Sequence, residues 1–433
     1  MLIYTHSITN RCRFGIGLVF ETLLNQAYTL TDDLEQYHAH EGEKLAYTFQ
    51  RPQNGFFVQA VSLLFETGIR TVEPGVFSFS TTKAFFATQG DFPFDLFAAG
   101  FYLVSRYEEY GSFRPDLYGR FPAEESLASR HGFLQTPVVN VWAEEFKKAL
   151  SRFYPALSFP TPVFQSITSF DVDVAYAFAG RSWLYHAAVF SKLMLTGSTK
   201  EIGRRWRVIR GREADPYDTY PGIQKLFTEY KTGPLFFFLL PGHRTRFDRN
   251  LPPSSGLLQR LIKITGSFSD LGIHPSYYSM NKPALLQREK AALEKITGRP
   301  VTKSRQHYLR FRLPGTYRNL LEAGITDDYS MGYAGLPGFR AGICTPFYFY
   351  DLGREQGTAL KIHPVIYMDG SFIEDMGLQP AAALAVIRDL IRTVKSVNGT
   401  CLSIWHNHTV SDEGIYKGWK GVLEESLRFM HSV

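Results

Sequence analysis

The chain has 433 residues, which corresponds to roughly two or three domains. Hydrophobic residues make up 44% of it and charged residues 20%, so the composition excludes a disordered chain, a collagen-like repeat and a disulfide scaffold. The 47 Lys and Arg residues exceed the 41 Asp and Glu residues only slightly, and no segment resembles a base-reading module, so we expect no nucleic-acid partner.

The first third of the chain holds no cluster of residues that suggests catalysis. Residues 95–111 are typical of a helix, with an aspartate that can cap its start and apolar residues at helical spacing. Residues 56–65 predict a second apolar element of undetermined type. Three prolines within residues 155–162 favour extended backbone and mark a boundary. We predict an accessory α+β domain over residues 1–155, with a scaffolding, docking or substrate-gating role, and a catalytic domain over residues 156–433.

Beyond this boundary, short apolar runs typical of buried strands alternate with helical segments. We predict strands at residues 163–171, 235–240, around 272, 302–311, 325–329, 362–368 and 401–405. The spacing of apolar residues predicts helices at residues 283–296 and 380–397. Apolar strands alternating with helices indicate an α/β architecture, with a parallel sheet and helices outside it. Active sites of such folds gather at the carboxyl ends of the strands.

Residues 183–212 combine an apolar, aromatic stretch with a dense basic cluster. The stretch at 183–195 is followed by Trp206 and Ile209 and, around them, by Arg204, Arg205, Arg207, Arg210 and Arg212. Charge runs of this kind usually form a solvated helix face. The interleaved apolar residues also fit a surface that binds anions or makes a peripheral contact with a membrane. The sequence leaves both interpretations open.

The cysteines and the apolar segments indicate the cellular compartment in which we expect the protein. The three cysteines, Cys12, Cys344 and Cys401, show no CxxC spacing, which argues for reducing surroundings and against a cysteine-based zinc site. The start of the sequence lacks the pattern of a secretion signal, and no apolar run approaches the length that spans a bilayer. We therefore expect a cytoplasmic protein. Its aromatic fraction of 15% suits either large cores or a cleft that stacks on sugar rings.

Polar side chains stand at or just after the carboxyl ends of several predicted strands. Asp171 and Asp173 are two residues apart, so both point to one face, about 7 Å apart, where they repel unless a cation lies between them or one is protonated. The other strand ends and following loops hold His274, Arg305, His307, Arg340, His406 and His408. Each of these residues alone has an ordinary structural explanation. Together they match a metal site with carboxylate and imidazole ligands, a spare carboxylate as base and a spare histidine as acid, so we expect a hydrolase.

The order of these motifs resembles the polysaccharide deacetylase superfamily (NodB-like, carbohydrate esterase family 4). The family's first motif, an Asp pair, is matched by Ser-Phe-Asp171-Val-Asp173, its Arg-x-Pro-Tyr motif is echoed by Arg305-Gln-His-Tyr308, and its final Leu-His is matched by Trp405-His406. Before the boundary, Pro93-Phe-Asp95 and Ser105-Arg-Tyr-Glu-Glu-Tyr110 are similar to the leader domain of a divergent bacterial branch. The deacetylase resemblance covers roughly residues 160–430 of the chain.

The resemblance implies a distorted (β/α) barrel of about seven strands and the metal-dependent removal of N-acetyl or O-acetyl groups from a carbohydrate. By position, Asp171 would be the general base, Asp173 a metal ligand and His274 the first imidazole ligand. Arg305 would orient the base, and His406 would be the general acid. The expected cofactor is a divalent metal, with Zn²⁺ as the first choice and Co²⁺, Ni²⁺ or Mn²⁺ as alternatives, and the expected partner is an acetylated sugar or glycan.

Two departures from the family pattern affect the metal ligands. The second motif, His-x-x-x-His, is broken because Tyr278 stands four residues after His274, and His307 is our candidate for the missing imidazole. One residue separates the Asp pair, which leaves open which carboxylate binds the metal.

The candidate substrate contacts are Arg340, Tyr277, Tyr278 and Trp405. Two alternatives to a carbohydrate deacetylase remain: a catalytically inactive glycan-binding protein, and a metal-dependent hydrolase of another amide or ester. The oligomeric state is not predicted.

Overall fold

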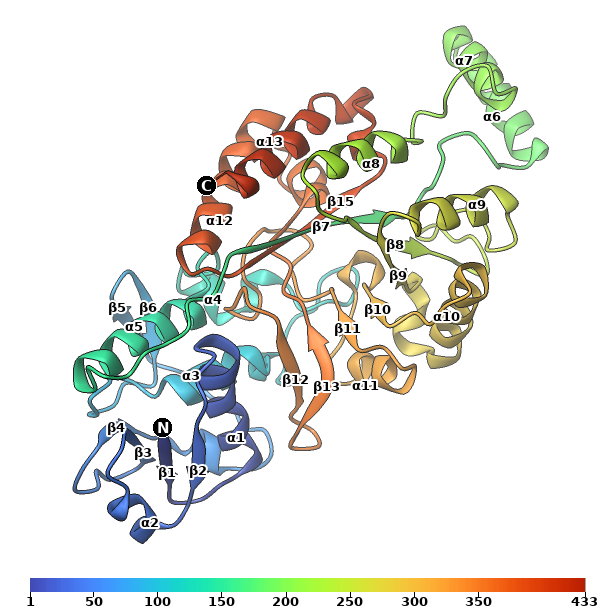
Figure 1. The fold of residues 1–433 in the computed structure, drawn as a ribbon. Helices are drawn as coiled ribbons and strands as arrows, with labels where there is room; N and C mark the ends of the chain where they lie inside the picture. Colours follow the sequence, from blue (N-terminus) through green and yellow to red (C-terminus); the bar gives the residue numbers. More distant parts are fainter. Residues whose placement is uncertain (433) are drawn as a thin grey trace.

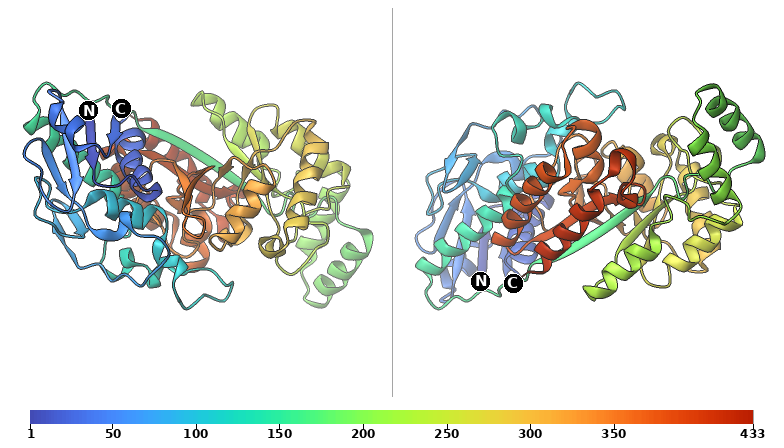
Figure 2. Two further views of the ribbon diagram at one scale, coloured as in Figure 1. Left: turned by 90° about the horizontal axis from the view of Figure 1, so that it is seen from below. Right: turned by 90° about the horizontal axis from the view of Figure 1, so that it is seen from above.

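The computed structural model describes residues 1–432, which build two mainly parallel sheets with helices around them (Figure 1). The smaller sheet lies at the N-terminal end of the elongated molecule, and the larger one runs through the rest of it. Figure 2 shows the same arrangement from two further sides, with a pair of helices standing out at the end opposite the small sheet. No helix within residues 1–432 is both long enough and apolar enough to cross a lipid bilayer.

The N-terminal part is built on a parallel sheet in the order β2-β1-β3-β4. Its elements are β1 (Leu2–Thr5), α1 (Asn10–Gly17), β2 (Thr29–Thr31), α2 (Leu34–Ala39), β3 (Lys44–Thr48), β4 (Phe56–Gln59), the hairpin of β5 (Val76–Phe79) and β6 (Thr82–Phe85), α3 (Leu96–Val104), α4 (Leu127–Arg130) and α5 (Val138–Phe153). Helices alternate with parallel strands here, so this part is closer to α/β than to the α+β fold that we expected.

The predicted helix at 95–111 is α3, and it ends earlier than expected. Asp95 caps its start by accepting a hydrogen bond from the Ala98 N–H at 2.9 Å. Every residue of α3 is buried, since the helix lies inside the N-terminal core. Arg106 then adopts a left-handed conformation with φ of 55°, which breaks the helix before a short 3₁₀ turn at Tyr107–Tyr110.

The larger sheet has nine strands within residues 1–432, in the order β12-β13-β11-β10-β9-β8-β7-β15-β14. These strands are β7 (Gln165–Val172), β8 (Leu235–Leu239), β9 (Asp270–His274), β10 (Lys303–Ser304), β11 (Asp327–Asp328), β12 (Phe347–Asp351), β13 (Gln356–Ile362), β14 (Tyr367–Met368) and β15 (Thr400–His406). Neighbours pair in parallel, apart from the antiparallel hairpin of β12 and β13. A mixed α/β fold is therefore confirmed.

A closed barrel is not confirmed. The edge strands β12 and β14 form no ladder with each other in residues 1–432, so the sheet stays open. The predicted strand at 302–311 is reduced to the two residues of β10, because the chain turns into a 3₁₀ segment at His307–Leu309. The predicted strand at 362–368 is instead the end of β13 and the separate strand β14.

Helices cover the large sheet and bury its apolar side chains. They are α8 (Tyr220–Glu229), α9 (Gly256–Thr265), α10 (Pro283–Thr297), α11 (Gly315–Glu322), α12 (Pro380–Ser396) and α13 (Trp419–His431), whereas α6 (Trp183–Leu195) and α7 (Thr199–Ile209) project from the body (Figure 1). The helices predicted at 283–296 and 380–397 correspond to α10 and α12 within one residue at each end. In α12, the buried residues recur at helical spacing, as in Ile387, Leu390, Ile391 and Val394.

A buried ion-pair network joins the N-terminal part to the region of the large sheet. Glu109 accepts hydrogen bonds from the guanidinium of Arg106, at 2.7 Å, and from that of Arg340, at 2.9 and 2.7 Å. All three residues are buried. Losing one member would leave a charge unpaired in the core, which costs about 3–5 kcal/mol, so the network fixes how these two regions meet.

Candidate metal centre

The carboxyl end of β7 supplies two carboxylates. β7 lies between β15 and β8, and Phe170 and Val172 on one of its faces are fully buried in the core. Because side chains alternate along a strand, Asp171 and Asp173 point to the other face, as the sequence predicts. Asp171 is buried and Asp173 is partly buried, and both line one cavity.

His274 is the last residue of β9, two strands from β7, and its ring nitrogens have distinct roles. Nδ1 lies 2.5 Å from the carbonyl oxygen of Arg305, so this nitrogen carries the proton and donates a hydrogen bond to that carbonyl. The lone pair is then on Nε2, which lies 3.2 Å from Oδ1 of Asp173 and 3.7 Å from Oδ2 of Asp171. His274 therefore presents to the carboxylate pair a nitrogen with a free lone pair, as a metal ligand requires.

His307 reaches the same point from a loop. It begins the 3₁₀ segment after β10, where the following Tyr308 has a left-handed φ of 63°. Its Nδ1 lies 3.0 Å from Oδ1 of Asp248, and its Nε2 lies 3.4 Å from Oδ2 of Asp173. The carboxylate of Asp248 thus fixes the ring and turns Nε2 towards Asp173, which is the usual support for a metal-binding histidine.

Asp173, His274 and His307 fit a divalent metal. One ligand atom from each of these residues lies within 4.8 Å of the others. Oδ1 of Asp173 is buried and has no hydrogen-bond partner within residues 1–432, although buried polar atoms are normally paired. A cation would satisfy this oxygen. One carboxylate and two imidazoles also form a usual protein ligand set for Zn²⁺ and related metals, with coordination positions left for water and substrate.

The same side chains hold one another by charge. Burial opposes the charge on Asp173, but the attraction of His307 outweighs it and holds the pKa of that carboxyl well below its usual range. Burial also opposes the charge on His307, but Asp173 and Asp248 raise the pKa of that imidazole to about 9. At neutral pH, a metal must therefore displace a proton from His307.

Arg305 orients Asp171. Its guanidinium is fully buried, donates to Oδ1 of Asp171 from Nη1 at 2.8 Å and to the Tyr329 carbonyl from Nε at 3.0 Å. The aromatic ring of Phe237 lies 4.4 Å from the guanidinium carbon. These contacts fix the arginine, and the arginine fixes one oxygen of Asp171 and leaves Oδ2 on the side of His274.

His406 ends β15 beside β7 and is held by Asp369. Nδ1 of His406 lies 2.7 Å from Oδ1 of Asp369, and Oδ2 of Asp369 accepts from the His406 backbone N–H at 2.7 Å. Burial lowers the pKa of His406, but the charge of Asp369 outweighs it and raises the pKa to about 10. Nε2 lies 3.6 Å from Oδ2 of Asp173, so a protonated imidazole lies beside this candidate ligand.

These groups surround a cavity of 190 Å³. It is lined by Tyr118, Arg120, Asp171, Asp173, His274, His307, Tyr308, Leu309, Ala334, Met368, Gly370, Glu374, Asp375, His406, His408 and Thr409. Tyr118 and Arg120 come from the N-terminal part. The ring of Tyr118 lies 5.2 Å from that of Tyr308, and Arg120 donates to the Tyr308 carbonyl at 2.7 Å. The N-terminal part therefore forms one wall of this cavity.

The four residues expected to bind substrate do not line this cavity. Arg340 is buried, and its guanidinium donates hydrogen bonds to Glu109 and to the Gly332 carbonyl. Trp405 is fully buried in the core. Tyr277 is stacked against Phe247, with ring centres 3.8 Å apart, and Tyr278 lies on the outer side of the same aromatic group and is 42% exposed.

Three residues of the site were missed in the sequence. Asp369 directly follows the predicted strand at 362–368, so the rule that polar groups gather at strand ends could have found it. Asp248 lies in a turn, where Oδ2 accepts a hydrogen bond from Thr245, and carries no sequence signal. Tyr118 lies far from the other site residues in the chain, and only the tertiary fold brings it to them.

Comparisons with known proteins separate the two parts of the chain. A model described as a family of unknown function (DUF7033) matches residues 1–155. No curated protein matches the chain.

Solved structures of polysaccharide deacetylases resemble part of the chain. A candidate polysaccharide deacetylase from Mycobacterium smegmatis is 16% identical, with a TM-score of 0.39, over 63% of this chain and 85% of that one. A polysaccharide deacetylase from Bacillus cereus is 10% identical, with a TM-score of 0.28, over 61% and 87% of the two chains. A CE4 family pseudoenzyme from Bacillus anthracis is 12% identical, with a TM-score of 0.29, over 63% and 66%. At these values the likeness does not decide the chemistry, which has to be inferred from the site itself.

Proposed function

We propose that this protein is a metal-dependent hydrolase that removes acetyl groups from a carbohydrate. One observation carries the proposal: a single cavity brings together a metal ligand set, a carboxylate oriented by an arginine and an imidazole held by a carboxylate. Hydrolysis of an amide needs these three parts, because water must be activated, the carbonyl polarised and the leaving amine protonated. The motif order, which resembles polysaccharide deacetylases, supports the same chemistry.

Asp171 is the proposed general base. A divalent metal held by Asp173, His274 and His307 would polarise the acetyl carbonyl and lower the pKa of a water molecule. Arg305 occupies Oδ1 of Asp171, so Oδ2 is the oxygen that takes the proton from the attacking water. Asp171 then holds that proton while the new bond forms between the water oxygen and the carbonyl carbon.

His406 is the proposed general acid. Its pKa of about 10 keeps Nε2 protonated in the neutral range, and Asp369 stabilises that charge from the other side of the ring. As the carbon–nitrogen bond breaks, Nε2 gives its proton to the amine, so that the amine leaves as a neutral group. The products are acetate and the free amino sugar, and the proton on Asp171 passes to solvent while His406 is reprotonated.

The cavity fits the acetyl end of a carbohydrate. Its 190 Å³ is smaller than the roughly 300–1,000 Å³ of most small-molecule sites, so it would admit the acetyl group and part of one sugar ring. Tyr118 and Tyr308 stand at its wall as a pair of aromatic faces, which suits contact with the apolar face of a sugar. An O-acetyl ester would use the same groups, with an alcohol in place of the amine.

The test combines metal analysis with acetate release. Purified protein is loaded with Zn²⁺, Co²⁺, Ni²⁺ or Mn²⁺ and incubated with N-acetylated sugars, O-acetylated sugars and a non-carbohydrate amide. We expect one bound metal and acetate only from acetylated carbohydrate. Bound metal with cleavage of the other amide alone would point to a different hydrolase, and failure to bind any of these metals would point to an inactive glycan-binding protein.

A further inference from the structure

A helical arm, residues 183–212, projects from the end of the molecule opposite the small sheet. It consists of α6 and α7 with the basic residues that follow, and a short loop after Asp173 leads into it. Figures 1 and 2 show α6 and α7 standing out at the end of the molecule opposite the small sheet. Arg181 ties the start of the arm to the body by donating to the Arg249 carbonyl at 2.9 Å.

One face of α6 is apolar and exposed. Trp183 is 75% exposed, Leu184 61%, Met194 66% and Leu195 89%. With 3.6 residues per turn, these side chains form a single stripe along the helix, together with the exposed Ala187 and Ala188. No charged residue lies within this stripe. Helices normally turn such a face inward, so contiguous exposure indicates an unfilled binding surface.

The opposite face of α6 already has its packing partners. His186 is buried, and Phe190 lies with its ring 6.4 Å from that of Trp206 on α7. Arg205 of α7 in turn lies over the ring of Phe178, at 4.1 Å, and so connects the arm to its base. The exposed stripe is therefore not needed to hold the two helices together.

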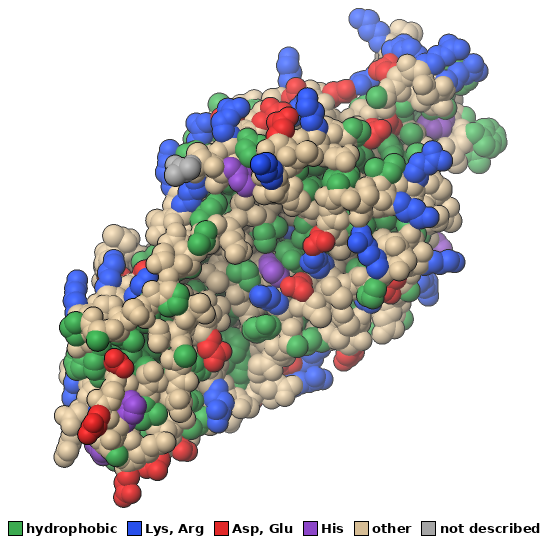
Figure 3. All heavy atoms as spheres, in the orientation of Figure 1, with side chains coloured by type: hydrophobic (Ala, Val, Ile, Leu, Met, Phe, Trp, Pro, Cys, Tyr) green, Lys and Arg blue, Asp and Glu red, His purple; other side chains and the backbone are tan. Residues whose placement is uncertain are grey.

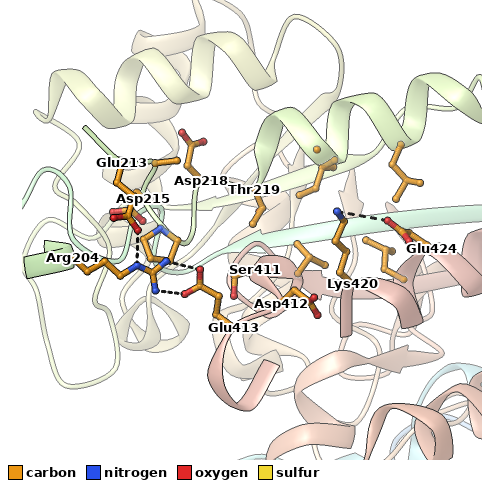
Figure 4. Close-up of a pocket in the computed structure, with 17 residues that line it drawn as sticks. Arg204, Glu213, Asp215, Asp218, Thr219, Ser411, Asp412, Glu413, Lys420 and Glu424 are labelled. Carbon is orange, nitrogen blue, oxygen red and sulfur yellow. Dashed lines mark hydrogen bonds and ion pairs between the residues drawn. The ribbon is translucent and has the colours of Figure 1, made fainter. Parts of the chain in front are cut away.

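Only some of the basic residues of the arm are paired. Arg204 forms ion pairs with Glu213 at 2.9 Å and with Glu413 at 2.6 Å, which anchor α7 beside a separate pocket (Figure 4). Arg207 also pairs with Glu213, and Arg205 pairs with Glu201. The side chains of these three arginines therefore stabilise the structure and are not free to bind an external anion.

Four further cations of the arm have no acidic partner within residues 1–432. They are Lys192, Lys200, Arg210 and Arg212, and all are exposed. Figure 3 shows Lys and Arg side chains gathered with hydrophobic ones at this end of the molecule. Arg210 lies over the exposed ring of Trp206 at 4.4 Å, so charge and apolar surface are presented together.

We propose that this arm docks the protein on a membrane surface that contains anionic lipids. The arm combines an exposed apolar helix face with unpaired cations, which are the two features by which interfacial helices bind, with the apolar side chains at the acyl boundary and the cations at the headgroups. An anionic bilayer satisfies both features of the arm at once. The proposal is independent of the proposed chemistry, because it concerns a surface outside the metal cavity.

Vesicle flotation of the full chain tests this proposal. We expect the protein to float with vesicles of phosphatidylcholine and phosphatidylglycerol, and to float much less with phosphatidylcholine alone. Added salt should weaken binding, because it screens the attraction between exposed cations and lipid. Absence of binding to the anionic vesicles at low salt would overturn the proposal.

Paired variants identify the surface. The variant Leu184→Ser with Leu195→Ser removes apolar contact, and Lys192→Glu with Arg212→Glu reverses charge; each should reduce partitioning about tenfold or more. The matched controls, Val163→Ser and Lys263→Glu, change exposed residues outside residues 183–212 and should bind like wild type. Wild-type binding by either arm variant would overturn the proposal.

Two further measurements distinguish other outcomes. Quenching of wild-type tryptophan fluorescence by brominated acyl chains requires no variant, and we expect it because Trp183 lies on the exposed stripe. Light scattering reports whether the stripe instead joins two copies of the chain; a dimer that the Leu184→Ser, Leu195→Ser variant separates, without vesicle binding, would contradict the proposal. Acetate release from a soluble substrate should be unchanged in the arm variants, so failure of docking leaves the proposed chemistry standing.

Discussion

The metal cavity and the helical arm place charged and apolar residues in opposite ways. In the cavity, Arg305 and Asp171 are buried and directly paired, and His406 is held by a buried carboxylate. In the arm, Lys192 and Arg212 have no acidic partner among the described residues 1–432, and Leu195 is almost fully exposed. Buried charges are stable only with precise partners, whereas an exposed apolar stripe gains stability only when something covers it. Under the two proposals, the cavity lacks only a cation, whereas the arm requires an external surface.

The largest expected effect comes from Asp173, the proposed central metal ligand. Asp173→Asn keeps the size of the side chain but removes the charge between His274 and His307, so affinity for Zn²⁺ should fall by more than about 100-fold, since even loss of an outer partner costs about 10–100-fold. Titration against a chromophoric chelator measures it. The control is Asp375→Asn, a carboxylate of the same cavity outside the ligand cluster. Equal affinities for the two variants would exclude Asp173 as a ligand.

The second-largest effect distinguishes the roles of two neighbouring histidines, His406 and His408. His406→Ala should lower kcat by about 10²–10⁴-fold without loss of metal, because the leaving amine then lacks its acid. His408→Ala is the matched control. Burial and the charge of His406 lower the pKa of His408 to about 4, so this ring is neutral at pH 7 and holds no acidic proton to give. Steady-state acetate release checks both variants, and equal losses would contradict the assignment.

Metal affinity should depend on pH through His307. In the metal-free protein, Asp173 and Asp248 overcome burial and raise the pKa of His307 to about 9, whereas the metal-bound ring carries no proton on Nε2. Lowering the pH below 9 therefore favours the metal-free state, and affinity should fall by up to about tenfold per pH unit. Calorimetric titration in two buffers of different ionisation heat should show proton release on binding at pH 7. Metal binding without proton release would rule out a protonated His307 in the metal-free protein.

The smallest effect concerns the wall supplied by the N-terminal part. Tyr118→Ala should raise KM by about two- to tenfold, with metal content unchanged, because one aromatic face contributes about 0.5–1.5 kcal/mol. Leu117→Ala changes the adjacent side chain, which is 99% exposed, and should leave KM unchanged. An unchanged KM in Tyr118→Ala would remove this residue from the substrate contacts.

The strand ends show what local rules can predict. Asp171, Asp173, His274 and His406 follow from two facts, the period of two along a strand and the common edge of parallel strands. The same period of two argues against Trp405, because it precedes His406 on β15 and must point to the opposite face, where it is fully buried. The position of Trp405 next to His406 in the sequence is therefore no evidence that Trp405 lies in the site.

Contacts between distant segments could not be predicted in this way. Tyr118 and Arg120 contact Tyr308, which lies far from them in the sequence, and no periodicity encodes that contact. The open edge of the large sheet is equally non-local, since closure depends on whether β12 and β14 meet. The division at residue 155 and the assigned catalytic roles stay predictions.

Acetate release by Asp171→Asn and wild-type protein, each at full metal loading, tests the central claim most directly. Asp171 is outside the ligand cluster, so the variant should retain the metal, yet it lacks the proposed base. We predict that wild-type protein releases acetate from an acetylated carbohydrate only when metal is bound, and that the loaded variant is slower by about 10²–10⁴-fold. Unchanged turnover in the loaded variant, or acetate release by metal-stripped wild-type protein, would contradict the account.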